Sequence, residues 1–342
     1  YVRGGKDFPM HDFRTRHSSA SEAIGYGKAL MFYHMLRARL GEEKFKAGLR
    51  DFYKENKFRV ASFNDLKRSF EKQTGRTRLD NFFTQWVDRT GAPELALKNV
   101  RLTRDLGEPA LEFTIAQLQE GPAYELEVPV AIQLECGRSP RIKRLFVSKK
   151  EEFFKYAAPI RPVRVELDPE FDLFRKLNPL ETPPTLSRLL GADNPLIILP
   201  SGAPGATYAA YEAFALAWTK DKANLPEIRK DSELDGLPKD RQVWILGGEN
   251  TFYPDAAARL KQLGARLSAR RVALDNQDFP LASDTFVFAD RNPGDPAYST
   301  GLILTCAPQK LQQLAAKLPH YGKYGYLVFD PAMTSIKTGN WE

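Results

Sequence analysis

The sequence predicts a multidomain α+β protein, because three patterns of apolar residues follow one another along its 342 positions. Residues 19–91 repeat apolar side chains at three- and four-residue spacing, which indicates antiparallel helices. Residues 95–170 form short runs that alternate polar and apolar side chains, which is typical of an antiparallel β-sandwich. Beyond residue 192, nearly continuous apolar runs alternate with helical stretches, which favours an α/β sheet. The predicted domains are 1–94 (helical), 95–175 (β-sandwich), 176–191 (a Pro-rich linker) and 192–342 (α/β).

The helical segment carries its own start and stop signals. An apolar stripe ends at Leu40, and Gly41 follows where a residue with positive φ is wanted. Ser62 stands three residues before Asp65, which predicts a capping box at the start of another helix. Gly75 and Gly91 are the predicted stops of the last two helices.

The β segment contains six alternating runs, separated by Gly, Pro or charged turns. Pro129 lies inside the third run, "YELEVPVAIQLE". Because proline cannot donate a ladder hydrogen bond, we expect that run to be an edge strand or to contain a bulge.

The final segment follows a stretch with several prolines, "RKLNPLETPPTLSRLL", which is typical of a stiff linker. Its apolar runs are of the kind that parallel sheets bury on both faces. They are "PLIILP", "QVWILGG", "TFVFAD", "TGLILTC" and "YGYLVFD". We therefore predict an open, mostly parallel sheet of the Rossmann or flavodoxin kind.

Charge and cysteine content narrow the functional classes. The net charge is +7, and residues 1–60 hold 13 basic and 7 acidic side chains. Such an excess attracts anions or nucleic acid, but the basic residues are scattered over helical positions, which favours a solvated helical surface and no nucleic-acid partner. Cys136 and Cys306 are far apart, which supports no disulfide framework. No segment offers about 20 unbroken apolar residues, so we expect no membrane span in this chain.

Two short motifs in the α/β segment are candidates for an accessory pocket. Gly202 and Gly205 lie between the first strand and the first helix, where a phosphate would meet a helix amino terminus. The stretch is neither G-x-G-x-x-G nor a P-loop, so a plain turn is the favoured alternative. The "KLPHYGKY" turn gathers His320, Tyr321 and Lys323, and its alternative is a turn held by tyrosine hydroxyls.

The sequence contains no recognisable metal or nucleophile motif. Its histidines are few and show no H-E-x-x-H pair, which would place two imidazoles on one helix face. No G-x-S-x-G elbow occurs either. We therefore expect this chain to bind no metal or other cofactor.

The stretch "AIGYGKALMFYHMLRARLG" sets a tyrosine between two glycines at the mouth of a helix. It is followed by "EEKFKAGLRDFYKENKF" and "ASFNDLKRSFEKQTGRTRLDNFFTQWVDRTGAPEL". In order and spacing these landmarks resemble the carboxyl-terminal half of the catalytic domain of aminopeptidase N-type zinc peptidases, the gluzincin family. The resemblance covers residues 19–95, and the β segment fits the sandwich that follows in many members.

The resemblance implies a catalytic role for Tyr26, which matches the tyrosine of the family's Tyr-Glu-Lys-Gly motif. There the hydroxyl donates a hydrogen bond to the oxyanion of the tetrahedral intermediate at zinc. A phenol stays protonated at neutral pH, so it can donate to a developing negative charge. Lys28 matches the family's lysine, and Gly25 and Gly27 would let a substrate backbone approach closely. A tyrosine that only caps a helix is the alternative.

The same resemblance implies that an upstream half is missing. The family's zinc ligands and its G-x-M-E-N motif precede the tyrosine, and this chain begins without Met in a polar loop. We expect a fragment of a zinc aminopeptidase that removes amino-terminal residues from peptides, inactive by itself, with the missing amino-terminal zinc domain as its partner. Gly27 and Ala29 depart from the motif, which leaves open a non-catalytic protein-binding scaffold. The α/β segment resembles an extra domain of some bacterial, exported members, which implies an exported or periplasmic parent.

Overall fold

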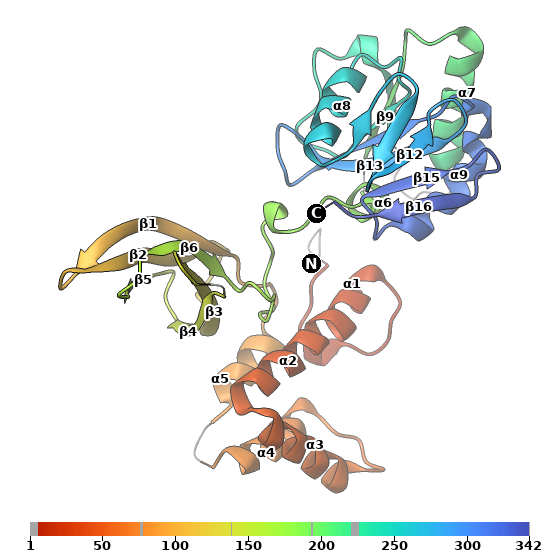
Figure 1. Ribbon diagram of the computed structural model, residues 1–342. Helices are drawn as coiled ribbons and strands as arrows, with labels where there is room; N and C mark the ends of the chain where they lie inside the picture. The colour runs from red at the N-terminus through yellow and green to blue at the C-terminus, as the bar shows by residue number, and fades with distance from the viewer. Residues whose placement is uncertain (1–5, 76–77, 138, 193, 220–225, 342) are drawn as a thin grey trace. The chain divides into compact units, whose positions relative to one another are not determined.

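The computed structural model describes residues 6–75, 78–137, 139–192, 194–219 and 226–341 (Figure 1). The chain divides into two compact units, Tyr1–Leu177 and Asn178–Glu342. The first unit contains both the helical segment and the β-strands of the sequence analysis. The second unit contains the α/β segment together with the Pro-rich stretch that precedes it.

Short helices occupy the amino-terminal part of the first unit, as predicted. Three departures from regular α-helix stand out: one 3₁₀ turn, η1, and two π-helical segments, η2 and η3. In chain order the elements are η1 (Met10–Asp12), α1 (Ser19–Glu22), η2 (Ala23–Lys28), α2 (Ala29–Leu40), α3 (Glu42–Asn56), α4 (Phe63–Thr74), α5 (Asp80–Phe83) and η3 (Thr84–Asp88).

The predicted start of α4 and the predicted stops of α2 and α4 are confirmed, whereas the last helical element ends at Asp88, with Arg89 as its cap, before the predicted stop at Gly91. Gly41 ends α2 with a φ of 81°, and Gly75 ends α4 with a φ of 69°. Ser62 and Asp65 form the reciprocal capping box at the start of α4, since each side chain accepts from the other residue's backbone N–H. These signals are local, and the backbone follows them.

The β part of the first unit consists of two antiparallel sheets, each with three strands among the described residues. Their orders are β1-β2-β5 and β4-β3-β6. The strands are β1 (Leu95–Asp105), β2 (Glu108–Gln117), β3 (Leu126–Leu134), β4 (Arg141–Val147), β5 (Glu151–Ala157) and β6 (Pro162–Leu167).

Of the two alternatives for the run that holds Pro129, the edge strand was wrong, whereas the run does contain a register shift. The strand that holds it, β3, is the central strand of its sheet, and the register shift between β3 and β6 lies at Gln133 and Leu134. Pro129 is tolerated because it lies just beyond the last β3–β6 pair, Val130 with Leu167. Its carbonyl still accepts a hydrogen bond from Asp168 N at 2.7 Å, where the chain leaves β6.

A single hydrophobic core joins the helices to the strands of this unit. Trp86 of η3 is its centre: its ring stacks on Tyr124 at 5.4 Å and meets the edge of Phe174 at 5.9 Å. Because these aromatic rings come from three separate segments, burial of the helices and of the sheets is mutually dependent.

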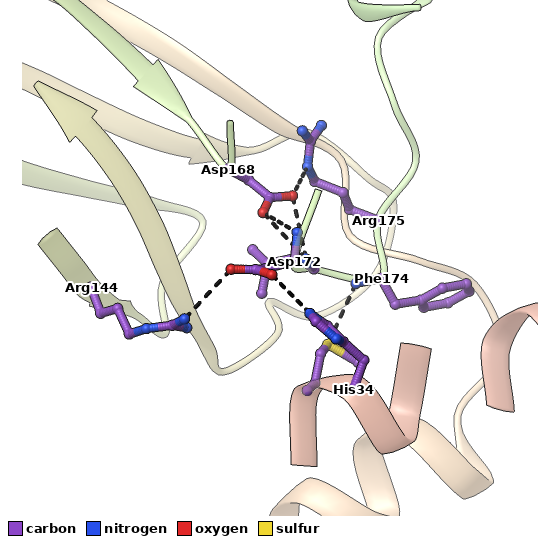
Figure 2. A network of polar contacts seen from close by, with 8 residues as sticks. His34, Arg144, Asp168, Asp172, Phe174 and Arg175 are labelled. Carbon is purple, nitrogen blue, oxygen red and sulfur yellow. Dashed lines mark hydrogen bonds and ion pairs between the residues drawn. The ribbon is translucent and has the colours of Figure 1, made fainter. Parts of the chain in front are cut away.

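A polar network ties α2 to the segment that follows β6 (Figure 2). His34 Nε2 lies 2.8 Å from Asp172 Oδ1, and Arg144 of β4 reaches the other oxygen of the same carboxylate at 3.5 Å. Behind it, Asp168 accepts hydrogen bonds from Asp172 N at 2.7 Å and from Arg175 Nε at 2.8 Å. The pair of Asp168 and Arg175 is buried, whereas the pair of His34 and Asp172 is partly exposed.

The second unit is built on a seven-stranded sheet within the described residues, in the order β16-β15-β13-β14-β9-β7-β8. Five strands point the same way, but β13 and β16 are antiparallel to their neighbours, so only three of the six neighbouring pairs are parallel and the sheet is mixed, not mostly parallel as predicted. The strands are β7 (Leu196–Leu199), β8 (Glu227–Lys230), β9 (Val243–Leu246), β13 (Thr285–Arg291), β14 (Ser299–Leu304), β15 (Tyr326–Phe329) and β16 (Ser335–Gly339).

Both faces of this sheet are covered, which explains its continuous apolar strands. One face packs against α6 (Leu186–Leu190), α7 (Gly205–Thr219) and α9 (Leu311–Lys317). The other packs against α8 (Tyr253–Gln262) and a small sheet of β10 (Arg266–Leu267), β11 (Arg271–Leu274) and β12 (Gln277–Pro280). Three short 3₁₀ turns, η4 (Pro179–Glu181), η5 (Asp231–Glu233) and η6 (Pro308–Lys310), complete the connections before η7 (Leu318–Tyr321).

Candidate functional site

The predicted catalytic tyrosine lies on a π-helical turn. The N–H of Ala29 donates to Ile24 O, five residues earlier, so η2 holds one extra residue between α1 and α2. Such single-turn widenings are frequent at functional sites. Gly25 and Gly27 flank Tyr26 and weaken the regular helix, because glycine gains least from the α conformation.

The side chain of Tyr26 is 58% exposed and points away from the helical core. Its hydroxyl forms no hydrogen bond with any residue that the structure describes. Its ring meets the ring of Phe13 edge-on, with centroids 5.9 Å apart and planes at 81°. The phenol is therefore fixed on one side by an aromatic contact and open at its oxygen.

The two glycines beside Tyr26 differ in their surroundings. A Cβ on Gly25 would lie 2.2 Å from the ring of Phe13, whereas a Cβ on Gly27 would meet nothing within 4 Å. Gly25 therefore makes room for a side chain of the same protein. Gly27 leaves its backbone open. That a substrate approaches it closely stays a prediction.

Lys28 is buried, with only 1% of its surface exposed. Its ammonium donates to Arg89 O at 2.7 Å and lies 5.7 Å from the ring centroid of Phe174. The lysine thus ties the end of η2 to the end of η3, the other π-helical turn. Sequence reasoning placed it beside a substrate, and the structure gives its ammonium an internal partner.

Burial lowers the pKa of the Lys28 ammonium below its ordinary value of 10.5, although the charge of Asp7 opposes the shift. The folded state therefore releases this proton at a lower pH than the unfolded chain does. The contribution of Lys28 to stability is complete above 10.5 and is lost as the pH falls through the folded pKa.

Replacing Lys28 by methionine is expected to lower the free energy of unfolding by about 1–3 kcal/mol, because Arg89 O loses its donor. The deficit relative to the unsubstituted chain should grow as the pH is raised from neutral to about 9.5. Trp86 is the single tryptophan of the first unit. Denaturant unfolding followed by ¹⁹F NMR of 5-fluorotryptophan at that position reports this unit alone. A deficit that does not change with pH would contradict the assignment.

A cleft of about 810 Å³ has Phe13 in its wall, whereas Tyr26 does not line it. Its walls mix apolar side chains, such as Tyr33, Phe52 and Phe83, with polar and charged ones. A pair formed by His11 and Asp88, with Nδ1 and Oδ1 2.9 Å apart, lies at its edge. The exposed phenol of Tyr26 and this cleft are therefore linked through the ring of Phe13, which contacts the phenol and lines the cleft.

The residues that the structure describes include no group of three or more His, Cys, Asp or Glu side chains that could hold a metal ion. The donor set around Tyr26 does not fit a zinc site, since a catalytic zinc takes three protein ligands. No helix in the same part of the chain has the length and apolar character needed to cross a bilayer.

The predicted accessory pocket is not assembled by the structure. Gly202 and Gly205 follow β7, whereas Tyr321 and Lys323 precede β15, and three strands separate β15 from β7. Neighbouring strands are about 4.8 Å apart, so the two groups lie well apart. His320 and Lys323 are exposed, and Tyr321 packs against Phe329 at 5.6 Å.

The loop at Gly202 already binds an anion of its own chain. The buried carboxylate of Asp231 accepts from Ser201 N at 2.8 Å and from Thr251 N at 2.7 Å. Burial opposes ionisation, yet the hydrogen bonds from Ser201 and Thr251 hold the pKa of Asp231 below its usual value. A phosphate placed here would meet this carboxylate, so the geometry favours the plain turn.

Sequence reasoning missed two residues of the Tyr26 site, Phe13 and Arg89. Phe13 belongs to an irregular segment with no periodicity, and Arg89 takes part through a backbone carbonyl. The sequence signal that could have pointed to Phe13 is Gly25, a helical glycine next to the candidate catalytic residue. Such a glycine marks a position where a neighbouring group comes too close for a Cβ.

Comparison with known proteins relates the helical segment to a peptidase family. Residues 13–86 match the Peptidase family M1 domain, and this range includes Phe13, η2 and most of η3. A probable aminopeptidase 1 of Sulfurisphaera tokodaii is 24% identical over 146 residues, which are 42% of this chain and 17% of that protein. The chain thus spans a small part of the length of the curated relative that it matches.

A solved structure was also matched at the level of the backbone. It is the aminopeptidase A of Legionella pneumophila, crystallised in complex with aspartic acid, with 19% identity and a TM-score of 0.38. The match covers 63% of this chain and 24% of that one.

Proposed function

We propose that this chain is the carboxyl-terminal part of a zinc-dependent aminopeptidase and that Tyr26 stabilises the oxyanion of peptide hydrolysis. One observation carries the proposal: an exposed tyrosine, whose hydroxyl forms no hydrogen bond with any described residue, stands at the start of a helix inside the segment that matches the M1 domain. A tyrosine that only capped its helix would use its oxygen for a backbone group. The hydroxyl of Tyr26 is left for a ligand.

Each residue of the site has a definite part in this proposal. Tyr26 donates a hydrogen bond to the carbonyl oxygen of the scissile amide as negative charge develops there. Gly27 leaves open backbone beside it, along which an extended peptide can lie. Lys28 holds the turn in place through Arg89 O and does not contact the substrate.

Zinc, which M1 peptidases use, would be held outside this chain. The described residues do not fit the metal, so its ligands belong to the amino-terminal zinc domain of the longer protein. When bound, zinc supplies a polarising charge for the carbonyl and an activated water. This chain alone is therefore expected not to hydrolyse peptides.

The test compares the longer protein with this chain. We expect the longer protein to release the amino-terminal residue of unblocked aminoacyl arylamides, to lose activity with 1,10-phenanthroline and to regain it with zinc. Substrates with an acetylated amino terminus are the control, and they should not be cleaved. Cleavage by this chain alone, or activity of the longer protein that resists the chelator, would contradict the proposal.

A further inference from the structure

A short segment ahead of the first helix packs directly on the π-helical turn. Phe13 ends η1, and its ring lies edge-on against Tyr26 and in the space that a Cβ of Gly25 would take. Two consecutive residues of the turn therefore contact the same ring. No other ring contact involving Tyr26 is found among the described residues.

Phe13 is itself held firmly. Its N–H donates to Met10 O at 3.2 Å, and its carbonyl accepts from Arg14 Nη1 at 3.1 Å. Met10 is buried in the core of the first unit, and His11 Nδ1 lies 2.9 Å from Asp88 Oδ1. The backbone of Phe13 is thus tied to η1, which is itself attached to the core through Met10 and to η3 through His11.

We propose that Phe13 is a positioning residue for Tyr26: its ring fixes the direction of the phenol, and Gly25 is glycine so that this ring fits. An exposed tyrosine on a glycine-flanked turn has several staggered orientations of similar energy. The edge-to-face contact favours one of them. The hydroxyl is then already in place when a substrate arrives, which is the condition for strong electrostatic stabilisation.

The catalytic meaning of this contact rests on the proposed function, whereas the contact can be tested on this chain without it. The spectroscopic probe is 3-fluorotyrosine placed at position 26. In the unsubstituted chain we expect unequal populations of the two ring orientations in the ¹⁹F spectrum. Phe13→Ala should bring the two populations close to equality.

The two glycines provide a matched pair for the packing half of the proposal. Gly25→Ala is expected to lower the melting temperature of the first unit by about 3 °C or more, because the new methyl displaces the ring. Gly27→Ala meets open space and should leave it unchanged or raise it. In the Phe13→Ala background the methyl at position 25 fits, so the double variant should be no less stable than Phe13→Ala alone.

Turnover separates positioning from packing. In the longer protein, Phe13→Ala and the double variant should both lower kcat about 10- to 100-fold with little change in KM. Phe13→Leu, which refills part of the space, should recover part of kcat. If Phe13 acted only through packing, the double variant would recover turnover together with stability. We expect it to be as stable as Phe13→Ala and to keep the low kcat.

Unchanged ring populations at position 26 in Phe13→Ala would overturn the proposal, and so would full kcat in that variant when Tyr26→Phe abolishes turnover. If Tyr26→Phe leaves turnover intact while Phe13→Ala still changes the ¹⁹F populations, the positioning contact stands and the proposed function fails. If Tyr26→Phe abolishes turnover and Phe13→Ala changes neither readout, the proposed function stands and this inference fails.

Discussion

Tyr26→Phe is expected to lower kcat of the longer protein about 100- to 1,000-fold, the usual loss when one oxyanion donor is removed. The substitution deletes a single oxygen. Because that oxygen has no partner among the described residues, its loss leaves no buried group unsatisfied. The free energy of unfolding should therefore change by less than about 0.5 kcal/mol.

The effect should appear in kcat more than in KM, since the hydrogen bond strengthens as charge develops on the carbonyl oxygen. Steady-state kinetics with an aminoacyl arylamide, together with the metal content of each preparation, measure both. Tyr53→Phe is the control: it removes the same atom from another exposed tyrosine of the first unit, on α3. Turnover of Tyr26→Phe above a tenth of the original, with zinc still bound, would exclude the oxyanion role.

The features of the site that the sequence predicted are local ones. A helix that begins near Tyr26 follows from apolar spacing, and the capping box at Ser62 and Asp65 follows from a spacing of three residues. In both cases the residues that determine the structure lie within one helical turn.

The features that the sequence did not predict depend on distant partners. Phe13 and Gly25 are 12 residues apart, with irregular chain between them, and Lys28 and Arg89 are 61 apart. Periodicity does not encode such pairs. The π-helical turn also leaves no signal, because one extra residue in a six-residue segment does not change the apolar spacing measurably.

Strand order is a further limit, and β3 and β13 illustrate it. Alternation predicts a half-buried strand, whereas most residues of β3 are buried because it lies between two partners, so Pro129 led to the wrong position. The run "TFVFAD" predicts a strand buried on both faces, and β13 is such a strand, yet it is antiparallel to β14. Burial constrains side chains and leaves strand direction to the connections.

The other large effect, on the free energy of unfolding, is expected when the buried ion pair near the carboxyl end of the first unit is broken. The side chains of Asp168 and Arg175 are 0% and 1% exposed, and Arg175 Nε donates to Asp168 Oδ2 at 2.8 Å (Figure 2). Arg175→Met keeps an unbranched chain and removes the charge. Removing one partner of a buried pair costs about 3–5 kcal/mol, and we expect that loss at neutral pH.

The loss should depend on pH in a definite direction. Burial raises the pKa of the Asp168 carboxyl above its usual value, and Arg175 is the main group that opposes the shift. Without the guanidinium the folded pKa rises further. A carboxyl whose pKa is raised on folding contributes stability that is complete below the unfolded pKa and lost as the pH rises through the folded one. The deficit of Arg175→Met should therefore shrink as the pH is lowered from neutral toward about 4.

Arg144→Met tests whether burial is the cause, because Arg144 pairs with Asp172 of the same segment at 3.5 Å but is partly exposed. Exposed pairs contribute about 0–1 kcal/mol, so this variant should lose no more than that. Unfolding of the first unit, followed at 5-fluorotryptophan 86 next to Phe174, measures both variants. Equal losses in the two variants, or a deficit of Arg175→Met that is the same at every pH, would mean that Arg175 acts through packing and not through the charge it brings to Asp168.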